Sequence, residues 1–230
     1  MPENSYFREP STQTTLLDIL FIYCKLNRDI SYRQGMHEVL APILWVIYCD
    51  AINPKGQEAT SGEMVVSACL NAAYIEHDTF TLFGLVMQTV RTFYETGNSS
   101  EAATSGGPSN STIVERSKRI HENYLHHADP ELAEHLAAIE VLPQIFLIRW
   151  VRLLFGREFL FEDVLALWDI LFAEDPALDL IDFISVSMLL RIRWQREVTT
   201  TLLYEVILNP SSPRRRLYWR SDSFTSLSYA

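Results

Sequence analysis

The chain has 230 residues, of which 48% are hydrophobic, which is enough for one large domain or two small ones. Its 19 Lys and Arg against 29 Asp and Glu give a formal net charge of −10, which argues against a chain-wide nucleic-acid or anionic-membrane surface. The chain has only eight glycines, about half the usual share of ~7%, and no Asn-Gly or Asp-Gly turn. The composition therefore predicts an all-α fold without a sheet.

The cysteines indicate a reducing compartment. Cys24, Cys49 and Cys69 are odd in number, lie in apolar stretches and show no CxxC spacing, so we expect buried thiols in an intracellular protein. The N-terminal residues carry no basic and apolar signal, and no apolar run reaches the ~18 residues that span a bilayer. The sequence therefore predicts a cytoplasmic protein that associates with membranes only peripherally.

Apolar periodicity in the first half of the chain predicts four helices. Ser11 is a candidate N-cap for the first of them, Asn27 a candidate end, and Asp78 a candidate N-cap for the fourth. Pro42 lies inside the second apolar repeat, where a missing N–H predicts a kink or a shifted helix start. The predicted helices cover residues 12–26, 36–47, 64–74 and 79–90.

The second half of the chain shows the same helical periodicity after a polar segment. Residues 96–112 are rich in Ser, Thr, Gly and Asn and predict a flexible insert inside one domain of residues 1–208. Residues 209–230, with their arginines and serines, predict a mobile tail. Further helices are predicted at residues 113–127, 130–139 after an Asp129 cap, 145–155 before a Gly156 C-cap, 161–172, 178–194 and 199–208.

Two groups of residues in the second half fit a buried role. Arg149 and Arg152 interrupt an almost wholly apolar helix, so their guanidinium groups must find acceptors or reach an edge. Trp150, Trp168 and Trp194 recur at helical spacing, which favours core positions over a ligand pocket.

Most chemical motifs are absent. His121-Glu122, His126-His127 and His37-Glu38 lack the i, i+4 histidine pair of a zinc helix, so no metal site is predicted. No GxSxG, P-loop or GxGxxG motif is present, so no nucleophile and no nucleotide cofactor of its own is predicted. The basic run Arg214-Arg215-Arg216 fits a solvated tail, with a membrane lipid, an acidic partner or an import receptor as the alternative partners.

One stretch between the first two helices stands out. In Tyr32-Arg33-Gln34-Gly35-Met36, Gly35 permits a sharp turn or a close approach to another chain, and the Gln34 amide offers both a donor and an acceptor. From the residues alone, Gln34 is either a solvated loop residue or part of a functional site.

Further motifs favour a functional role for Gln34, because they resemble those of a known family. Together with the Tyr32 to Met36 stretch they resemble the TBC domain of Rab GTPase-activating proteins, over roughly residues 1–208. Residues 34–42 and 188–193 further resemble the member-5 subgroup of that family. The other motifs are Leu147-Ile148-Arg149-Trp150, Arg157-Glu158-Phe159 and Leu165-Ala166-Leu167-Trp168-Asp169-Ile170-Leu171-Phe172.

The resemblance implies a multi-helical domain that activates a partner GTPase rather than an enzyme acting on its own. Gln34 corresponds to the glutamine finger that orients the attacking water, and Tyr32 and Gly35 position it. The GTP and the magnesium belong to the partner Rab. The implied setting is vesicle traffic at endosomes, with an endosomal coat complex as a second class of partner.

One part of the family pattern is not found. The arginine finger belongs to an Ile-x-x-Asp-x-x-Arg motif upstream of Tyr-x-Gln-Gly, and neither Arg8 nor Arg28 has those surroundings. The resemblance thus implies that the arginine finger is absent, with the chain beginning just after that motif, and that activity is impaired by about 10³–10⁵. The alternative is a catalytically silent scaffold that binds a Rab or a coat complex.

Overall fold

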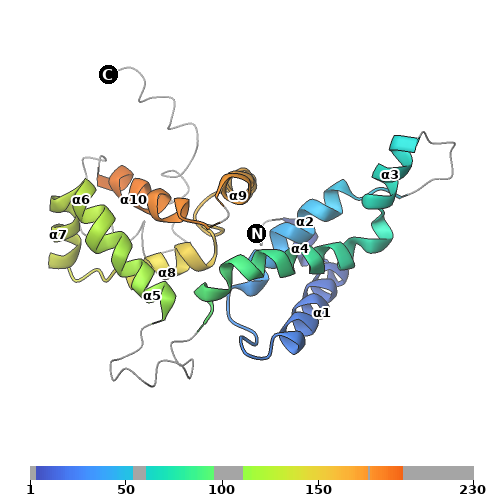
Figure 1. Cartoon of the computed structure of the whole chain (residues 1–230), viewed down its shortest axis with the longest axis horizontal. Coiled ribbons are helices and arrows are strands. Elements are labelled where there is room, and N and C mark those ends of the chain that lie inside the picture. The colour runs from blue at the N-terminus through green and yellow to red at the C-terminus, as the bar shows by residue number, and fades with distance from the viewer. Residues whose placement is uncertain (1–3, 54–60, 96–110, 176, 194–230) are drawn as a thin grey trace, which may run out of the picture. The chain divides into compact units, whose positions relative to one another are not determined.

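The computed structural model describes residues 4–53, 61–95, 111–175 and 177–193 (Figure 1). Within these ranges every regular element is a helix, apart from one isolated parallel bridge between Ile52 and Asn71, which confirms the predicted all-α class. The chain divides into two compact units, Met1–Arg91 and Thr92–Ala230. No helix in the described part of the chain has the length and apolar character required to span a bilayer.

Three helices form the body of the first unit, because α1, α2 and α4 each contact the other two. Tyr23 of α1 lies edge-on to Phe83 of α4, with ring centroids 5.0 Å apart, and Met36 of α2 is fully buried. Tyr6 lies edge-on to Trp45 and tilted against Tyr48 of α2, and these contacts join the first short helix to α2. The elements are the 3-10 helix Ser5–Arg8, α1 Pro10–Leu26, α2 Met36–Asp50, α3 Ser61–Cys69, the 3-10 helix Ala72–Tyr74 and α4 Ile75–Val90.

Several predicted helix limits in this unit need correction. Helix α1 begins at Pro10 rather than after a Ser11 cap, because proline suits the first helical position, and it ends before Asn27 as predicted. Helix α2 begins at Met36 and carries Pro42 inside it, so of the two expected outcomes the shifted start is wrong. Asp78 lies in the first turn of α4 and is not its N-cap, since the short helix Ala72–Tyr74 runs directly into α4.

In the described residues of the second unit, a long broken helix is followed by four further helices. Helix α5 continues into a π-helix, a widened turn that the apolar periodicity did not reveal. Asp129 then caps α7 as predicted, accepting a bond from the Leu132 N–H at 3.0 Å with Pro130 at the first position. The elements are α5 Thr112–Arg119, the π-helix Ile120–Leu125, α6 His126–Ala128, α7 Pro130–Ala138, α8 Gln144–Arg152, α9 Phe161–Glu174 and α10 Leu180–Arg193.

The segment after α8 is buried rather than looped out. Leu154 and Phe155 both have positive φ, 46° and 61°, and both are fully buried, so the helix ends before Gly156 and the predicted C-cap is wrong. The Trp168 indole N–H donates to the Leu154 carbonyl at 2.9 Å and the Phe155 N–H to the Trp150 carbonyl at 2.9 Å. These bonds stabilise a left-handed conformation that non-glycine residues otherwise disfavour.

Both arginines of α8 have acceptors, as predicted. The Arg149 Nε lies 3.1 Å from Glu158 Oε1, and the Arg152 Nε donates to the Phe93 carbonyl at 3.1 Å. Burial of the Arg149 guanidinium, with the nearby Arg157 charge, lowers its pKa from the ordinary value. This ion pair holds the turn after α8 against the helix.

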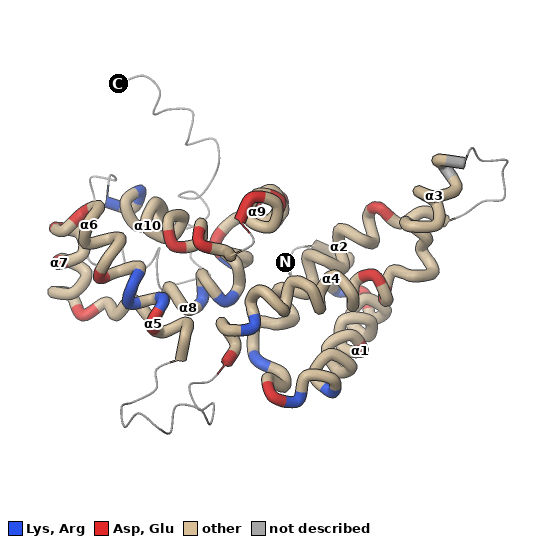
Figure 2. The backbone as a smooth tube through the Cα atoms, viewed as in Figure 1, with Lys and Arg blue, Asp and Glu red and all other residues tan. Residues whose placement is uncertain are grey.

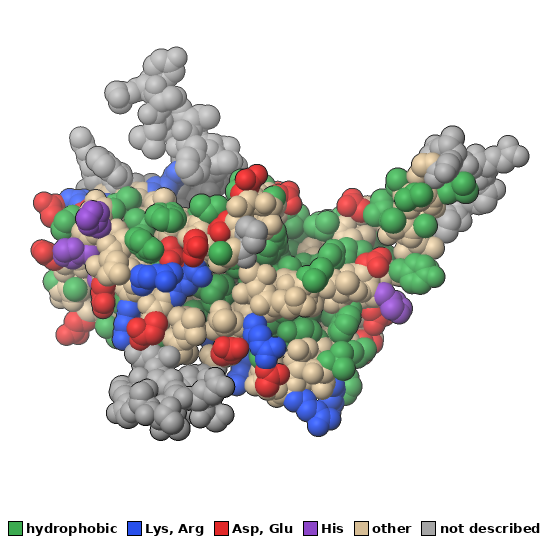
Figure 3. Space-filling view, viewed as in Figure 1, with side chains coloured by type: hydrophobic (Ala, Val, Ile, Leu, Met, Phe, Trp, Pro, Cys, Tyr) green, Lys and Arg blue, Asp and Glu red, His purple; other side chains and the backbone are tan. Residues whose placement is uncertain are grey.

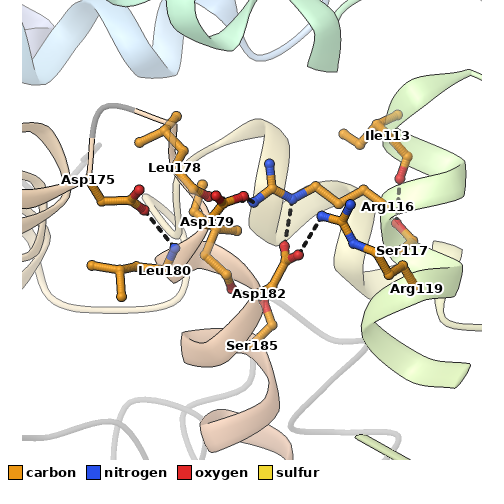
Figure 4. A network of polar contacts seen from close by, with 11 residues as sticks. Ile113, Arg116, Ser117, Arg119, Asp175, Leu178, Asp179, Leu180, Asp182 and Ser185 are labelled. Carbon is orange, nitrogen blue, oxygen red and sulfur yellow. Dashed lines mark hydrogen bonds and ion pairs between the residues drawn. The ribbon is translucent and has the colours of Figure 1, made fainter. Parts of the chain in front are cut away.

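A buried carboxylate joins α5 to α10 (Figure 4). Asp182 is 2% exposed at its side chain, and its two oxygens lie 2.5 Å from Arg116 Nε and 2.7 Å from Arg119 Nη2. Arg116 also donates to the Leu178 carbonyl. Figure 2 marks the basic positions on α5 and the acidic positions at the start of α10 that make up this network.

Trp150 and Trp168 are buried, which confirms their predicted core positions, but the cysteines differ from expectation. Cys49 and Cys69 are exposed and Cys24 is half-buried, because the former two lie in the last turns of α2 and α3, away from the core. The expectations for Trp194 and for residues 96–110, 199–208 and 209–230 lie outside the described residues.

Candidate functional site

The loop between α1 and α2 is closed at its start by Asn27. The Asn27 side-chain amide donates to the Tyr23 carbonyl at 2.9 Å, and the Asn27 carbonyl accepts from the N–H groups of Ile30 and Ser31 at 3.2 and 3.0 Å. Ile30 is buried, whereas Ser31 takes a left-handed φ of 56°. The chain therefore leaves α1 in a fixed direction.

A tight turn follows and carries Gln34 at its corner. The Met36 N–H donates to the Arg33 carbonyl at 3.2 Å, and Gly35 has φ 106° and ψ −23°. A positive φ with ψ near zero is the third position of a type II turn, which places Gln34 at the second. Gln34 is exposed, while Gly35 and Met36 are buried behind it. The turn thus presents the Gln34 amide outward.

Contacts across the turn involve His37, the second residue of α2. The Tyr32 hydroxyl lies 3.0 Å from His37 Nδ1, and the Arg33 N–H lies 3.4 Å from the Met36 sulfur. Burial, followed by the Glu38 and Cys24 charges, raises the pKa of Tyr32 above its ordinary value, so its hydroxyl stays protonated at neutral pH. The sequence excluded His37 as a metal ligand and placed it in the subgroup motif without a role in the turn; the i, i+5 spacing from Tyr32 was the available signal.

The site is an exposed side chain and not a pocket. A groove of about 370 Å³ in the first unit is lined by Val46, Leu70 and Leu82 with Asp50 and Asp78, and Gln34 is not among its lining residues. Figure 3 shows hydrophobic side chains reaching the surface of this unit over α3 and α4. Within the described ranges no cluster of His, Cys, Asp and Glu could hold a metal ion.

The remaining predicted residues have other positions. Arg8 and Arg28 are both exposed, and Arg28 lies in the loop that leads to Gln34. Arg149, Trp150 and Glu158 belong to the second unit, where they form its core and its buried ion pair. The structure therefore brings Tyr32, Gln34 and Gly35 together with His37, and it buries Trp150, Glu158 and Trp168 of the other motifs in the second unit.

Replacing Gly35 by Ala tests the turn directly. We expect Gly35→Ala to lower the free energy of unfolding by about 1–3 kcal/mol, because a side chain strains the backbone at φ 106°. Chemical denaturation followed by circular dichroism measures this change. Gly84→Ala in α4 is the matched control: no atom lies within 4 Å of its added Cβ, so it should be neutral or stabilising. Equal effects of the two substitutions would contradict the type II turn.

Comparison with known proteins places this geometry in a family. The sequence model of the Rab-GTPase-TBC domain matches residues 1–196. Human TBC1 domain family member 5 is 38% identical over 84% of this chain and 26% of that protein, and the Dictyostelium discoideum homolog B is 30% identical over 84% and 28%. The chain thus spans about a quarter of the length of these relatives.

A solved structure supports the same fold. The crystal structure of the Ypt/Rab-GAP domain of Gyp1p superposes with a TM-score of 0.69 at 19% identity, covering 92% of this chain and 63% of that one. Because a family model matches most of the chain and a relative is 38% identical over 84% of it, this chain belongs to the Rab-GTPase-TBC domain family.

Proposed function

We propose that this chain is a GTPase-activating domain for a Rab-family GTPase and that Gln34 is the residue it inserts into the partner's active site. The observation that carries the proposal is the exposed Gln34 amide at the corner of a turn, backed by buried Met36. No hydrogen bond to the Gln34 amide is found among the described residues, so both its donor and its acceptor are available to a partner. Membership of the Rab-GTPase-TBC domain family supports a Rab as that partner.

In the proposed chemistry Gln34 orients the attacking water and forms no covalent bond. The Gln34 carbonyl accepts a hydrogen bond from the attacking water while its N–H₂ donates toward the transferring phosphoryl group, which orients the nucleophile in line. The GTP and its magnesium belong to the Rab, so this chain needs no cofactor. Tyr32 and Gly35 hold the turn and do not react.

In this proposal the lack of an arginine finger limits the rate of GTP hydrolysis. No Asp-x-x-Arg motif surrounds Arg8 or Arg28, so the chain has no group assigned to stabilise charge on the phosphoryl oxygens. An arginine finger contributes about 10³–10⁵ in rate, and we propose that this chain alone accelerates hydrolysis by correspondingly less.

The lack of an arginine-finger motif around Arg8 and Arg28 favours a second candidate, a catalytically silent TBC-like scaffold that binds a Rab or a coat complex. Under either proposal the protein acts in endomembrane traffic, in the cytoplasm and at endosomal surfaces. The two candidates differ in whether the chain binds a Rab more tightly in the transition state of GTP hydrolysis than with intact GTP. A scaffold gains nothing from a nucleotide that resembles the transition state.

That difference defines the experiment. Binding of this chain to a panel of purified Rabs is measured with a non-hydrolysable GTP analogue and with GDP plus aluminium fluoride, which mimics the transferring phosphoryl group. We expect at least one Rab to bind at least about 10-fold more tightly with the mimic. Single-turnover GTP hydrolysis with the chain in excess gives the rate, and a relative bearing both fingers is the positive control. Equal binding in both nucleotide states, with unchanged hydrolysis, would favour the scaffold.

A further inference from the structure

A side-chain bridge spans the turn that carries Gln34. The four turn residues, 33–36, lie between Tyr32 and His37, whose side chains meet with the hydroxyl oxygen 3.0 Å from Nδ1. Two other contacts close the same turn: the Met36 N–H donates to the Arg33 carbonyl, and the Arg33 N–H approaches the Met36 sulfur. The bridge is thus the outermost of three contacts that enclose Gln34.

The two ends of the bridge differ in rigidity. His37 is the second residue of α2, and its neighbours Met36, Val39 and Leu40 have no exposed surface, so its backbone is fixed by the core. Tyr32 has a non-helical backbone next to the left-handed Ser31, and the residue is 49% exposed. The hydrogen bond therefore ties a loop residue to a rigid helix.

The position of the proton on the His37 ring follows from the neighbouring Glu38 carboxylate. Glu38 Oε1 lies 3.8 Å from His37 Nε2, and its negative charge favours a proton on that nitrogen. The tautomer with Nε2–H leaves Nδ1 as the acceptor, which matches a Tyr32 hydroxyl that remains a donor at neutral pH. The Tyr32 hydroxyl then donates to His37 Nδ1, while Glu38 lies near Nε2 at a distance too long for a hydrogen bond.

We propose that His37 is a positioning residue for Gln34, holding the turn in place through the Tyr32 hydroxyl. The proposal rests on the function proposed for Gln34 and adds a residue that this function did not assign. Both side chains are about half exposed, so the bridge restricts the loop rather than building the core. Its loss leaves more conformations of the turn to be restricted when the partner binds.

The test combines a measurement on the free chain with one on the complex. In the free chain, ¹⁵N NMR of the His37 ring nitrogens is compared between the natural chain, Tyr32→Phe and Tyr48→Phe. Tyr48 is the matched control because it is 48% exposed, lies on α2 and has no hydrogen bond to His37. We expect only Tyr32→Phe to shift the Nδ1 resonance. An unchanged Nδ1 resonance in that variant would overturn the bridge.

In the complex, the affinity for a Rab is measured with a non-hydrolysable GTP analogue and with GDP plus aluminium fluoride. Tyr32→Phe, His37→Ala and the double variant should each lower the preference for the mimic by about 2- to 10-fold, with the double variant no worse than the single ones. Variants that keep the natural preference overturn the positioning role. A natural chain with no preference instead overturns the proposed function, so the two failures are distinguishable.

Discussion

Replacing Asp182 by Ala is expected to lower the free energy of unfolding by about 3–5 kcal/mol. The Asp182 side chain is 2% exposed and bonds both Arg116 and Arg119, and the Arg116 side chain is itself only 10% exposed. Without Asp182, Arg116 keeps the Leu178 carbonyl and the Phe93 ring but loses its carboxylate partner. A buried guanidinium without a paired charge is costly, and this cost sets the size of the effect.

Urea denaturation followed by circular dichroism measures the effect as a change in midpoint. Asp179→Ala is the matched control because it removes the same group three residues earlier from a side chain that is 72% exposed and 4.0 Å from Arg116. We expect the control to cost at most about 1 kcal/mol. If the two substitutions shift the midpoint equally, Asp182 does not join α5 to α10 in the way described.

Replacing Gln34 by Ala is expected to have the largest effect on activity. On the Rab that responds most strongly, we expect the rate acceleration to fall by about 10²-fold, or to the intrinsic rate where the whole acceleration is smaller. Gln34 is exposed and contributes nothing to the core, so stability should not change. Single-turnover hydrolysis and thermal denaturation of the same preparation separate the two effects.

Two further substitutions sharpen this result. Gln34→Glu keeps the side-chain shape but places a carboxylate where the phosphoryl charge develops, so it should be as inactive as Gln34→Ala. Gln88→Ala removes an equivalent exposed amide from α4 and should leave the rate unchanged. An active Gln34→Ala variant would mean that another residue orients the water.

Local signals in the sequence predicted much of the fold. Asn27 ends α1 and Asp129 caps α7 as predicted, because each forms bonds with residues three or four positions away. The end of α8 could not be predicted in this way. Leu154 and Phe155 adopt left-handed backbone because Trp168, fourteen residues beyond Leu154, bonds the Leu154 carbonyl. The apolar periodicity of the sequence cannot predict a contact between residues this far apart.

The candidate site was predicted in part. Gln34 and Gly35 were identified by resemblance, and the structure adds the turn that displays them. The Asp182 network was not predicted, because its partners are 63 and 66 residues away along the chain. Charges at such separations meet only through the fold, and no helical pattern distinguishes Asp182 from an exposed aspartate. The buried thiols were predicted wrongly for the same reason, since an apolar stretch does not reveal where its helix leaves the core.

The short range of the bonds around Gln34 has a consequence for folding. Each hydrogen bond that shapes the turn joins residues at most five positions apart, from Asn27–Ile30 to Tyr32–His37. Contacts this local close small loops, which form quickly, whereas the Arg116–Asp182 contact must close a loop of 66 residues. The shape of the turn is therefore encoded in about a dozen consecutive residues. Substitutions that weaken the second unit should reduce the amount of folded protein while leaving the Gln34 turn unchanged in the molecules that fold.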